Sequence, residues 1–392
     1  MSSRRDEVSV AQHAVLGFVW HRERSPVGAV EASIVLTGLD CVLGGLPEHF
    51  VLGYSQGAPT GRIRPSREQE TPADSVMDPP AMSFDVSPFR HLYPFESRWL
   101  DLDGLRMHYL DEGVGQPIVM VHGNPTWSFY FRKLVKEFRS THRAVAIDHI
   151  GCGLSDKPGD ARYEYTLERR VTDLETLLDR LGINENLTLV GHDWGGMIAV
   201  ACALRQMERV KRIVLFNTAG FLLPAGKRLP WQLRLIRNAP LLPDLLVRGL
   251  NAFAVGATYL ATAKGLPADV RNAYRAPYDS WRNRIATLRF VEDIPVKPRD
   301  RAYALAKWVD DHVERLRTLP VFIGWGARDF VFDRDFLAEW RRRLPKAEIH
   351  VCEDAGHYVL EDAGERLIPK LREFIDHTTP ALSASTGAEA AR

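Results

Sequence analysis

Short apolar stretches alternate with longer amphipathic stretches from residue 97 to residue 377 of this 392-residue chain. Short apolar runs between turn residues are typical of buried strands, and longer amphipathic runs are typical of surface helices. The sequence predicts strands at 97–102, 105–110, 117–122, 144–148, 187–190, 210–217, 321–325 and 348–352, and helices at 128–138, 166–181, 333–344 and 361–377. This alternation predicts an α/β fold, in which a mostly parallel central sheet carries helices on both faces.

One interval of the pattern is too long to be a single crossover between two strands. Residues 219–318 are helical in pattern and rich in aromatic side chains, and they are interrupted by Pro224, Pro230, Pro240, Pro243, Pro267, Pro277, Pro295 and Pro298. We expect this interval to form a helical cap, inserted into a core that consists of residues 82–218 and 319–377.

The two ends of the chain lack the pattern. Residues 1–81 combine arginine clusters with short apolar pieces that follow neither a helical nor a strand period. We expect them to be disordered or an over-extended reading frame with a native start at Met82. The alternative is a small structured appendage, because residues 30–45 contain a candidate strand. The tail, residues 378–392, has the composition of a disordered segment.

Charge and cysteine content narrow the class of function. Lys and Arg number 51 against 50 Asp and Glu, so no net field favours nucleic acid or an anionic membrane, and a small neutral partner is expected. No apolar run reaches the roughly 18 residues of a transmembrane helix, and no cleavable signal is evident. The four cysteines are far apart and lack metal-binding spacing, as in a reduced cytoplasmic protein; they are Cys41, Cys152, Cys202 and Cys352.

Candidate chemistry begins where the predicted strand 187–190 runs through Gly191-His-Asp-Trp-Gly195 directly into a helix of small residues. A strand, a sharp turn and a helix in this order form a nucleophile elbow, which presents one side chain at the carboxyl edge of the sheet. Here that side chain is Asp193. The flanking glycines fit, because a Cβ there would collide with neighbouring backbone, and Gly196 allows the helix to approach the strand. A carboxylate is ionised at neutral pH and displaces leaving groups from alkyl carbon, so an ester intermediate on Asp193 is expected.

The partners that such a nucleophile requires follow the last two predicted strands. His357 follows the strand 348–352 in a Gly-His turn, and Asp329 follows the strand 321–325, so both reach the carboxyl edge of the sheet beside Asp193. We expect His357 to activate water and Asp329 to orient the imidazole. The nearby acids Asp333, Glu353 and Asp354 are alternatives to Asp329, and a surface-loop histidine is the alternative for His357.

The loop after the strand 117–122 supplies candidate hydrogen-bond donors. It reads His122-Gly-Asn-Pro-Thr-Trp127, and a His-Gly pair at a strand end offers backbone N–H groups to developing negative charge. The Asn124 amide and the Trp194 indole add two side-chain donors. Placed on two sides of an apolar pocket, they would hold a halide or carboxylate leaving group. The alternatives are a packing role for Trp194 and a turn role for Asn124.

Together the segments His-Gly-Asn-Pro-Thr-Trp-Ser and Gly-His-Asp-Trp-Gly-Gly resemble the haloalkane dehalogenase family, whose members are α/β-hydrolases with a helical cap. Asp329 after the seventh strand, with Asn217 after the sixth and with Asn124 and Trp194 as donors, resembles the third subfamily. Epoxide hydrolases share the Asp elbow, usually carry an aromatic residue in place of Asn124, and use cap tyrosines. The predicted cap holds four tyrosines, Tyr259, Tyr274, Tyr278 and Tyr303.

Longer segments, 150–158 in the core and 251–258 and 278–290 in the cap, resemble the β-lactone decarboxylases of bacterial long-chain olefin biosynthesis, a group within that subfamily. The likeness covers roughly residues 82–376. It implies that Asp193 opens a cis-β-lactone with two alkyl chains and that the products are a cis-alkene and CO2. It further implies a small apolar substrate, no metal or other cofactor, and a place beside other enzymes of olefin biosynthesis.

Three other functions stay open at this point. A haloalkane dehalogenase would give alcohol and halide, an epoxide hydrolase would give a diol, and a catalytically silent sensor would only bind. The complete set of Asp193, Asp329 and His357 disfavours the silent sensor, because binding alone does not require a strained elbow. The motifs do not specify which lactone carbon is attacked.

The composition boundary near Met82 predicts the outcome of a truncation. A chain that starts at Met82 should equal the full chain in melting temperature and turnover, because the preceding residues lack the apolar face that would offset their ordering entropy. Thermal unfolding of both chains tests this prediction. A drop of several degrees, equivalent to more than about 1 kcal/mol, would show instead that the first 81 residues pack on the rest.

Overall fold

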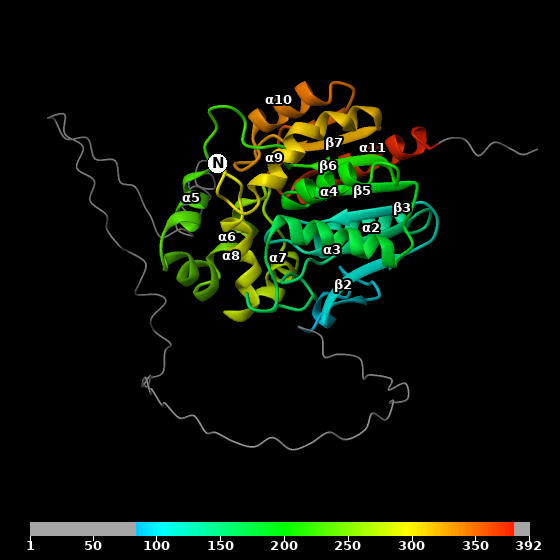
Figure 1. The fold of residues 1–392 in the computed structure, drawn as a ribbon. Helices are drawn as coiled ribbons and strands as arrows, with labels where there is room; N and C mark the ends of the chain where they lie inside the picture. The colour runs from blue at the N-terminus through cyan, green and yellow to red at the C-terminus, as the bar shows by residue number, and fades with distance from the viewer. Residues whose placement is uncertain (1–83, 380–392) are drawn as a thin grey trace, which may run out of the picture. The chain divides into compact units, whose positions relative to one another are not determined.

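The structure is a computed structural model that describes residues 84–379. An eight-stranded sheet forms its centre (Figure 1), with the strand order β1-β2-β4-β3-β5-β6-β7-β8. The strands are β1 Arg98–Leu102, β2 Leu105–Glu112, β3 Pro117–Val121, β4 Arg143–Ile147, β5 Leu187–His192, β6 Val210–Phe216, β7 Val321–Gly326 and β8 Glu348–Cys352. The strand β2 is antiparallel to both β1 and β4, and the later pairings are parallel.

The predicted α/β fold is therefore confirmed, and the observed strand ends differ from the predicted ones by at most two residues. The predicted helix 128–138 begins as a short 3₁₀ turn, η2 Ser128–Phe131, and continues as α2 Arg132–Phe138. The expectations for residues 1–81, for Cys41 and for the tail beyond residue 379 lie outside the described residues.

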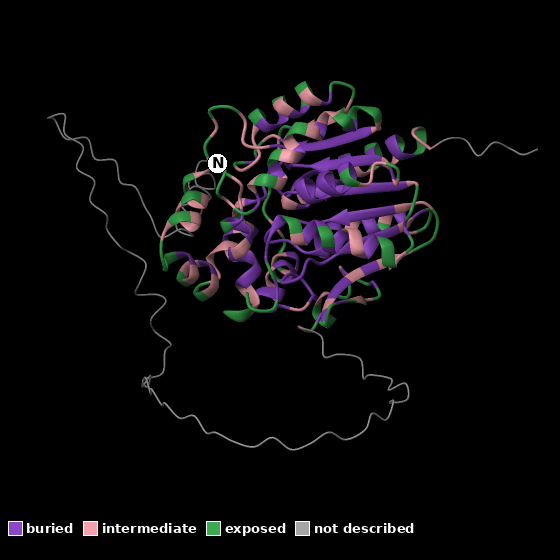
Figure 2. Ribbon diagram, viewed as in Figure 1, coloured by how far each residue is buried: buried purple, intermediate pink, exposed green. Residues whose placement is uncertain are grey.

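Side-chain alternation along the buried strands gives the sheet its two covered faces. In β3, Val119 and Val121 pack into one apolar core, whereas Ile118 and Met120 pack into the other. Both faces are covered, so the central strands are mostly purple in Figure 2. The first core includes α3 Leu167–Arg180, α4 Trp194–Arg205, α9 Tyr303–His312 and α10 Arg334–Arg343, and the second includes α2 and α11 Val359–His377.

The long interval after β6 forms helices that gather at one end of the sheet (Figure 1). They are α5 Trp231–Asn238, η3 Asp244–Gly249, α6 Ala252–Leu260, α7 Ala268–Arg275, η4 Ala276–Tyr278, η5 Arg282–Arg284 and α8 Ile285–Glu292. The helix α9, which follows them, returns to the sheet, where its Ala306 and Val309 lie in the same core as α4. None of the helices in residues 84–379 is long and apolar enough to cross a membrane.

Candidate functional site

The turn between β5 and α4 holds Asp193 in a conformation that side chains rarely adopt, with φ 55° and ψ −128°. Close packing on two sides allows only glycine at the positions two residues before and two residues after Asp193. A Cβ on Gly191 would lie 2.5 Å from the Cα of Gly196, and one on Gly195 would lie 1.9 Å from the carbonyl oxygen of Val121. The turn is thus wedged between its own helix and the end of β3, and this arrangement places the Asp193 carboxylate at the carboxyl edge of the sheet.

The loops after β7 and β8 bring Asp329 and His357 to the same edge. His357 Nδ1 lies 2.7 Å from Asp329 Oδ2, and its Nε2 lies 3.4 Å from Asp193 Oδ2. All three residues are buried, and Asp193 retains 8% of its surface. The three residues predicted from separate parts of the sequence therefore meet with the imidazole between the two carboxylates, which is the geometry of a nucleophile, a histidine and an orienting acid.

The two carboxylates determine the charge of this histidine. Burial by itself lowers the pKa of His357, but Asp329 and Asp193 together raise it to about 10. Burial likewise favours the neutral form of Asp193, yet the hydrogen bond and charge of His357 lower the pKa of this carboxyl group below its ordinary value. In the free protein at neutral pH, Asp193 is therefore an anion and His357 is an imidazolium.

Asn124 contributes a backbone donor and, separately, a side-chain amide. Its backbone N–H donates to Asp193 Oδ1 over 2.8 Å, while His357 lies against the other carboxylate oxygen. The amide Nδ2 donates over 3.0 Å to the carbonyl oxygen of Thr287 in the cap helix α8. Its Oδ1 is buried with no hydrogen-bond partner among the described residues. The loop that supplies the donor is thereby tied to the cap.

Trp194, the other predicted donor, lies directly after the nucleophile at the start of α4. Its ring contacts Phe290 of α8 at a centroid distance of 5.6 Å, and the guanidinium of Arg170 lies 5.8 Å from the ring centre. The indole N–H of Trp194 forms no hydrogen bond within residues 84–379, so this donor is free.

Two of the four tyrosines of residues 219–318, Tyr274 and Tyr278, are buried against loops of the site, and their hydroxyl groups are already bonded. Tyr278 donates over 3.1 Å to the carbonyl oxygen of Thr126, and Tyr274 donates over 2.5 Å to Glu361. Burial raises the pKa of both tyrosines well above its ordinary value. A tyrosine that activates an epoxide oxygen has to direct its hydroxyl group at the substrate, and these two serve instead to fasten the cap.

Two residues of the site have roles that the sequence did not reveal. Asn217, after β6, donates from Nδ2 to Asp329 Oδ2 over 3.0 Å and accepts from the Gly326 N–H over 2.7 Å, so it holds Asp329 in place beside His357. His192 lies just before the nucleophile, with its Nε2 3.0 Å from the carbonyl oxygen of His357. Burial lowers the pKa of His192 to about 3, so this histidine is a neutral support for the His357 loop. The sequence signal that could have indicated this role is the position of His192 directly before Asp193 in the elbow motif.

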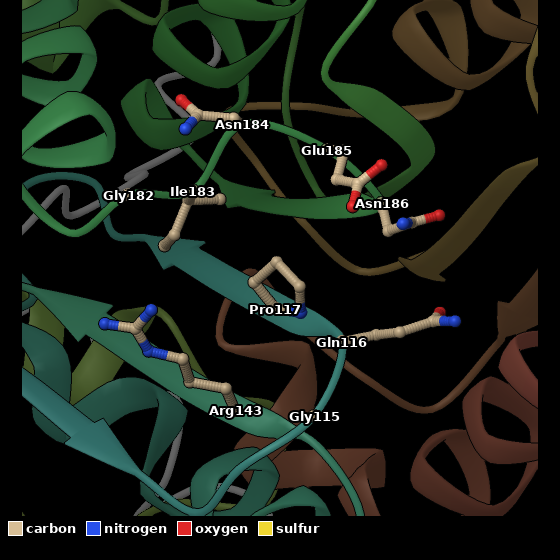
Figure 3. A pocket seen from close by; sticks show the side chains of 9 residues that line it. All are labelled: Gly115, Gln116, Pro117, Arg143, Gly182, Ile183, Asn184, Glu185 and Asn186. Atoms are coloured by element: carbon tan, nitrogen blue, oxygen red, sulfur yellow. The ribbon is translucent and has the colours of Figure 1, made fainter.

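A separate hollow of about 520 Å³ lies at the opposite, amino edge of the sheet (Figure 3). It is lined by the segment Gly115–Pro117 before and at the start of β3, by Arg143 at the start of β4, and by the loop 182–186 before β5. The guanidinium of Arg143 is bonded to Asp111 and to the Leu181 carbonyl oxygen, so it is not free to bind a ligand. This hollow is therefore distinct from the site of Asp193.

Comparison with known proteins places these residues in a familiar fold. A family model of the alpha/beta hydrolase fold matches residues 116–364. The cis-3-alkyl-4-alkyloxetan-2-one decarboxylase of Shewanella oneidensis is 50% identical over 288 residues, which cover 73% of this chain and 90% of that relative. The protein of the same name in Xanthomonas campestris pv. campestris is 47% identical over 292 residues, covering 72% of this chain and 97% of the relative.

Dehalogenases are similar at lower identity. Haloalkane dehalogenase 2 of Mycobacterium bovis is 32% identical over 293 residues, which cover 74% of this chain and 99% of that protein. The crystal structure of the haloalkane dehalogenase DatA of Agrobacterium tumefaciens superposes with a TM-score of 0.65 at 24% identity, covering 72% of this chain and 97% of that chain. This structural match supports the fold alone.

Replacing the nucleophile tests the role of Asp193. The variant Asp193→Asn should fold normally, because the amide keeps the size of the side chain and can accept from the Asn124 N–H, yet it should lose several orders of magnitude in turnover. The measurement is turnover beside circular dichroism and thermal unfolding. The variant Asp333→Asn, whose carboxylate pairs with Lys227, is the matched control. Near-normal turnover of Asp193→Asn would overturn the nucleophile assignment.

The charge of His357 gives a pH prediction. Since the pKa of His357 is raised to about 10 in the folded protein and is about 6.5 in the unfolded chain, the charged ring stabilises the fold fully below about pH 6.5. That contribution is lost as the pH rises through about 10. In ¹⁵N NMR the His357 ring should be an imidazolium at about pH 8 and should lose its proton at lower pH in Asp329→Asn than in the wild type. A neutral ring at pH 8 in the wild type would contradict the two-carboxylate account.

Proposed function

This chain belongs to the haloalkane dehalogenase family of α/β-hydrolases, and from that membership we propose that it decarboxylates a cis-3,4-dialkyl-oxetan-2-one, a β-lactone, to a cis-alkene and CO2. The single observation that carries the proposal is the 50% identity to a decarboxylase named for that substrate, over a span that includes the cap. The placement of Asp193 between the Asn124 N–H and His357 supplies the required nucleophile.

The atom balance of the reaction indicates which lactone carbon Asp193 attacks. In the lactone ring O1 is the ring oxygen, C2 is the carbonyl carbon, and C3 and C4 carry the two alkyl chains. Attack on C4 breaks the C4–O1 bond and forms an ester between C4 and Asp193. The former lactone group is thereby released from C4 as a carboxylate on C3. Loss of CO2 then breaks the C3–C2 bond, whose electron pair forms the C3=C4 double bond as Asp193 leaves C4. Attack on the carbonyl carbon would leave O1 on C4 and lead to a hydroxy acid, so C4 is the carbon that accounts for an alkene.

The same route accounts for a cis product. Displacement at C4 from the side opposite O1 places the Asp193 oxygen anti to the C3–C2 bond. Anti elimination from that arrangement keeps the two alkyl groups on one side of the new double bond. The complete cycle consumes no water and moves no proton, which fits a nucleophile that is buried and already ionised.

The charged form of His357 supports both steps of this route. As an imidazolium 3.4 Å from Asp193, it stabilises the carboxylate that is re-formed when Asp193 leaves C4. The second amide N–H of Asn124, beyond the one bonded to Thr287, and the indole N–H of Trp194 would hold the carboxylate released from the ring. Asn217 would fix Asp329 so that the imidazole keeps its orientation. The part of the chain we describe has its cysteines free, in keeping with a cytoplasmic enzyme that acts beside others of olefin biosynthesis.

A haloalkane dehalogenase remains the second candidate, because Asp193 could equally displace halide and the 32% identical relative carries that name. In that reaction the ester removes the negative charge of Asp193, the pKa of His357 falls, and the neutral ring can activate water. An epoxide hydrolase is not favoured, because Tyr274 and Tyr278 bond to protein groups.

A side-by-side assay distinguishes the two candidates. The protein should convert a long-chain cis-β-lactone to alkene and CO2 over many turnovers and should release little bromide from 1-bromobutane. The variant His357→Gln lacks the base for ester hydrolysis, so any bromide should appear as a single burst, with an alkyl adduct on Asp193 by intact mass. Sustained bromide release without alkene formation would make the chain a dehalogenase.

A second prediction concerns the donor that holds the released carboxylate. Asn124→Ala should cost about 2 to 4 kcal/mol of transition-state stabilisation, or about two orders of magnitude in kcat/KM for the lactone. Asn283→Ala, which removes an exposed cap amide bonded to Asp279, is the matched control and should leave turnover unchanged. If both variants are equally active, Asn124 is a turn residue only.

A further inference from the structure

The outer part of the cap combines exposed apolar side chains with an excess of positive charge. Residues 222–284 contain ten Lys and Arg, three Asp and no Glu, so this segment carries a net charge of +7 within a chain whose net charge is +1. Three of the ten cations pair with acids from outside the segment, Lys227 with Asp333, Arg237 with Asp300 and Lys264 with Asp354, and the segment keeps a positive excess beyond these pairs. Six of the ten cations form no ion pair within residues 84–379: Arg228, Arg234, Arg271, Arg275, Arg282 and Arg284.

Apolar side chains project from the same elements. We define the outer cap surface by Trp231, Leu241, Leu242, Leu245, Leu250 and Trp281, each of which is exposed. Helix α5 has no buried residue along its length (Figure 2), although it carries one tryptophan, two leucines and one isoleucine. Leu241 is 86% exposed, and its φ of 60° is a backbone conformation that bulky residues avoid. An exposed leucine in this strained conformation lowers the stability of the isolated protein and buries no apolar surface in return.

The outer cap surface is a connected patch. The guanidinium of Arg248 lies 4.5 Å from the centre of the Trp281 ring, and Arg284 donates to the carbonyl oxygens of Arg248 and Gly249. The elements α5 and η3 both pack on α8. Thr287 and Phe290 of α8 contact Asn124 and Trp194, so this surface lies one helix away from the site.

We propose that the outer cap surface docks on an anionic lipid bilayer. Leucine and tryptophan tips enter the region between headgroups and acyl chains, while arginines bind the anionic headgroups, which is the chemistry of interfacial segments. A second copy of this chain would bring two positive surfaces together, and leucine tips would gain little from a nucleic-acid backbone. A lactone with two long alkyl chains partitions into the bilayer, so docking there would bring the site to its substrate. This part of the proposal rests on the proposed function.

Vesicle flotation of the full-length protein without any lactone tests the docking, so its result does not depend on the proposed reaction. The protein should float with vesicles of phosphatidylcholine mixed with phosphatidylglycerol, should bind phosphatidylcholine alone far more weakly, and should dissociate as salt is raised. Leu241→Ser with Leu242→Ser should weaken binding at least about tenfold. Arg228→Gln and Arg234→Gln should each weaken it about fivefold, the equivalent of about 1 kcal/mol per charge.

Matched controls lie on exposed positions outside the cap. Val114→Ser removes an apolar side chain that is 83% exposed in the turn between β2 and β3, and Arg341→Gln removes an exposed charge of α10. Both should bind vesicles as the wild type does. The proposal is overturned if the wild type does not float, if the cap variants bind as the controls do, or if sedimentation shows a dimer that Leu241→Ser with Leu242→Ser dissociates. Loss of vesicle binding with unchanged turnover of a short, water-soluble β-lactone would support docking as separate from the chemistry.

Discussion

The close approach of three backbone segments at Asp193 is the constraint on which the site depends. The elbow is held at a positive φ because Gly191 and Gly195 lie against α4 and the end of β3, where no side chain fits. This close packing by itself places the Asp193 carboxylate beside the N–H of Asn124. Since the sheet fixes the relative positions of β3, β5, β7 and β8, the donor loop, the nucleophile, the acid and the histidine reach one edge from positions far apart in the sequence.

Electrostatics then defines what the site does. One imidazole lies between two carboxylates, so His357 is charged at rest, and its charge depends on whether Asp193 is a carboxylate or an ester. The same residues therefore suit two chemistries. In lactone decarboxylation, the negative charge would pass from Asp193 to the carboxylate released from the ring, so His357 would stay an imidazolium and stabilise the departing Asp193. In dehalogenation, halide would leave and the esterified Asp193 would be neutral, so His357 would lose its proton and become the base that hydrolyses the ester. The helices of residues 219–318 are bonded to the donor loop through Asn124 and Tyr278.

The sequence predicted those features that depend on local pattern. The glycine spacing around Asp193 and the Gly-His turn at His357 were sufficient to predict that these two side chains lie together at the carboxyl edge of the sheet; their catalytic roles stay predictions. Asp329 was preferred among four acids, and the structure pairs the others elsewhere: Asp333 with Lys227, Glu353 with Arg334 and Asp354 with Lys264.

Features made by distant contacts could not be predicted. The bond from Asn124 to Thr287 joins residues 163 positions apart, and the support of Asp329 by Asn217 depends on how two loops end after neighbouring strands. The raised pKa of His357 is likewise a property of the assembled site, because no segment of sequence contains both of its carboxylate partners. Secondary structure follows from local pattern, whereas hydrogen-bond partners and pKa values follow from tertiary packing.

The most direct test of the central claim is the oxygen content of Asp193 after turnover in H₂¹⁸O. If the ester collapses by loss of CO2, Asp193 leaves with its own oxygens, and mass spectrometry of the peptide that contains the elbow should find no ¹⁸O while the cis-β-lactone is converted to alkene. If the ester is instead hydrolysed by attack of water on the Asp193 carboxyl carbon, that peptide should gain ¹⁸O. Label in Asp193 during lactone turnover would contradict the decarboxylative account.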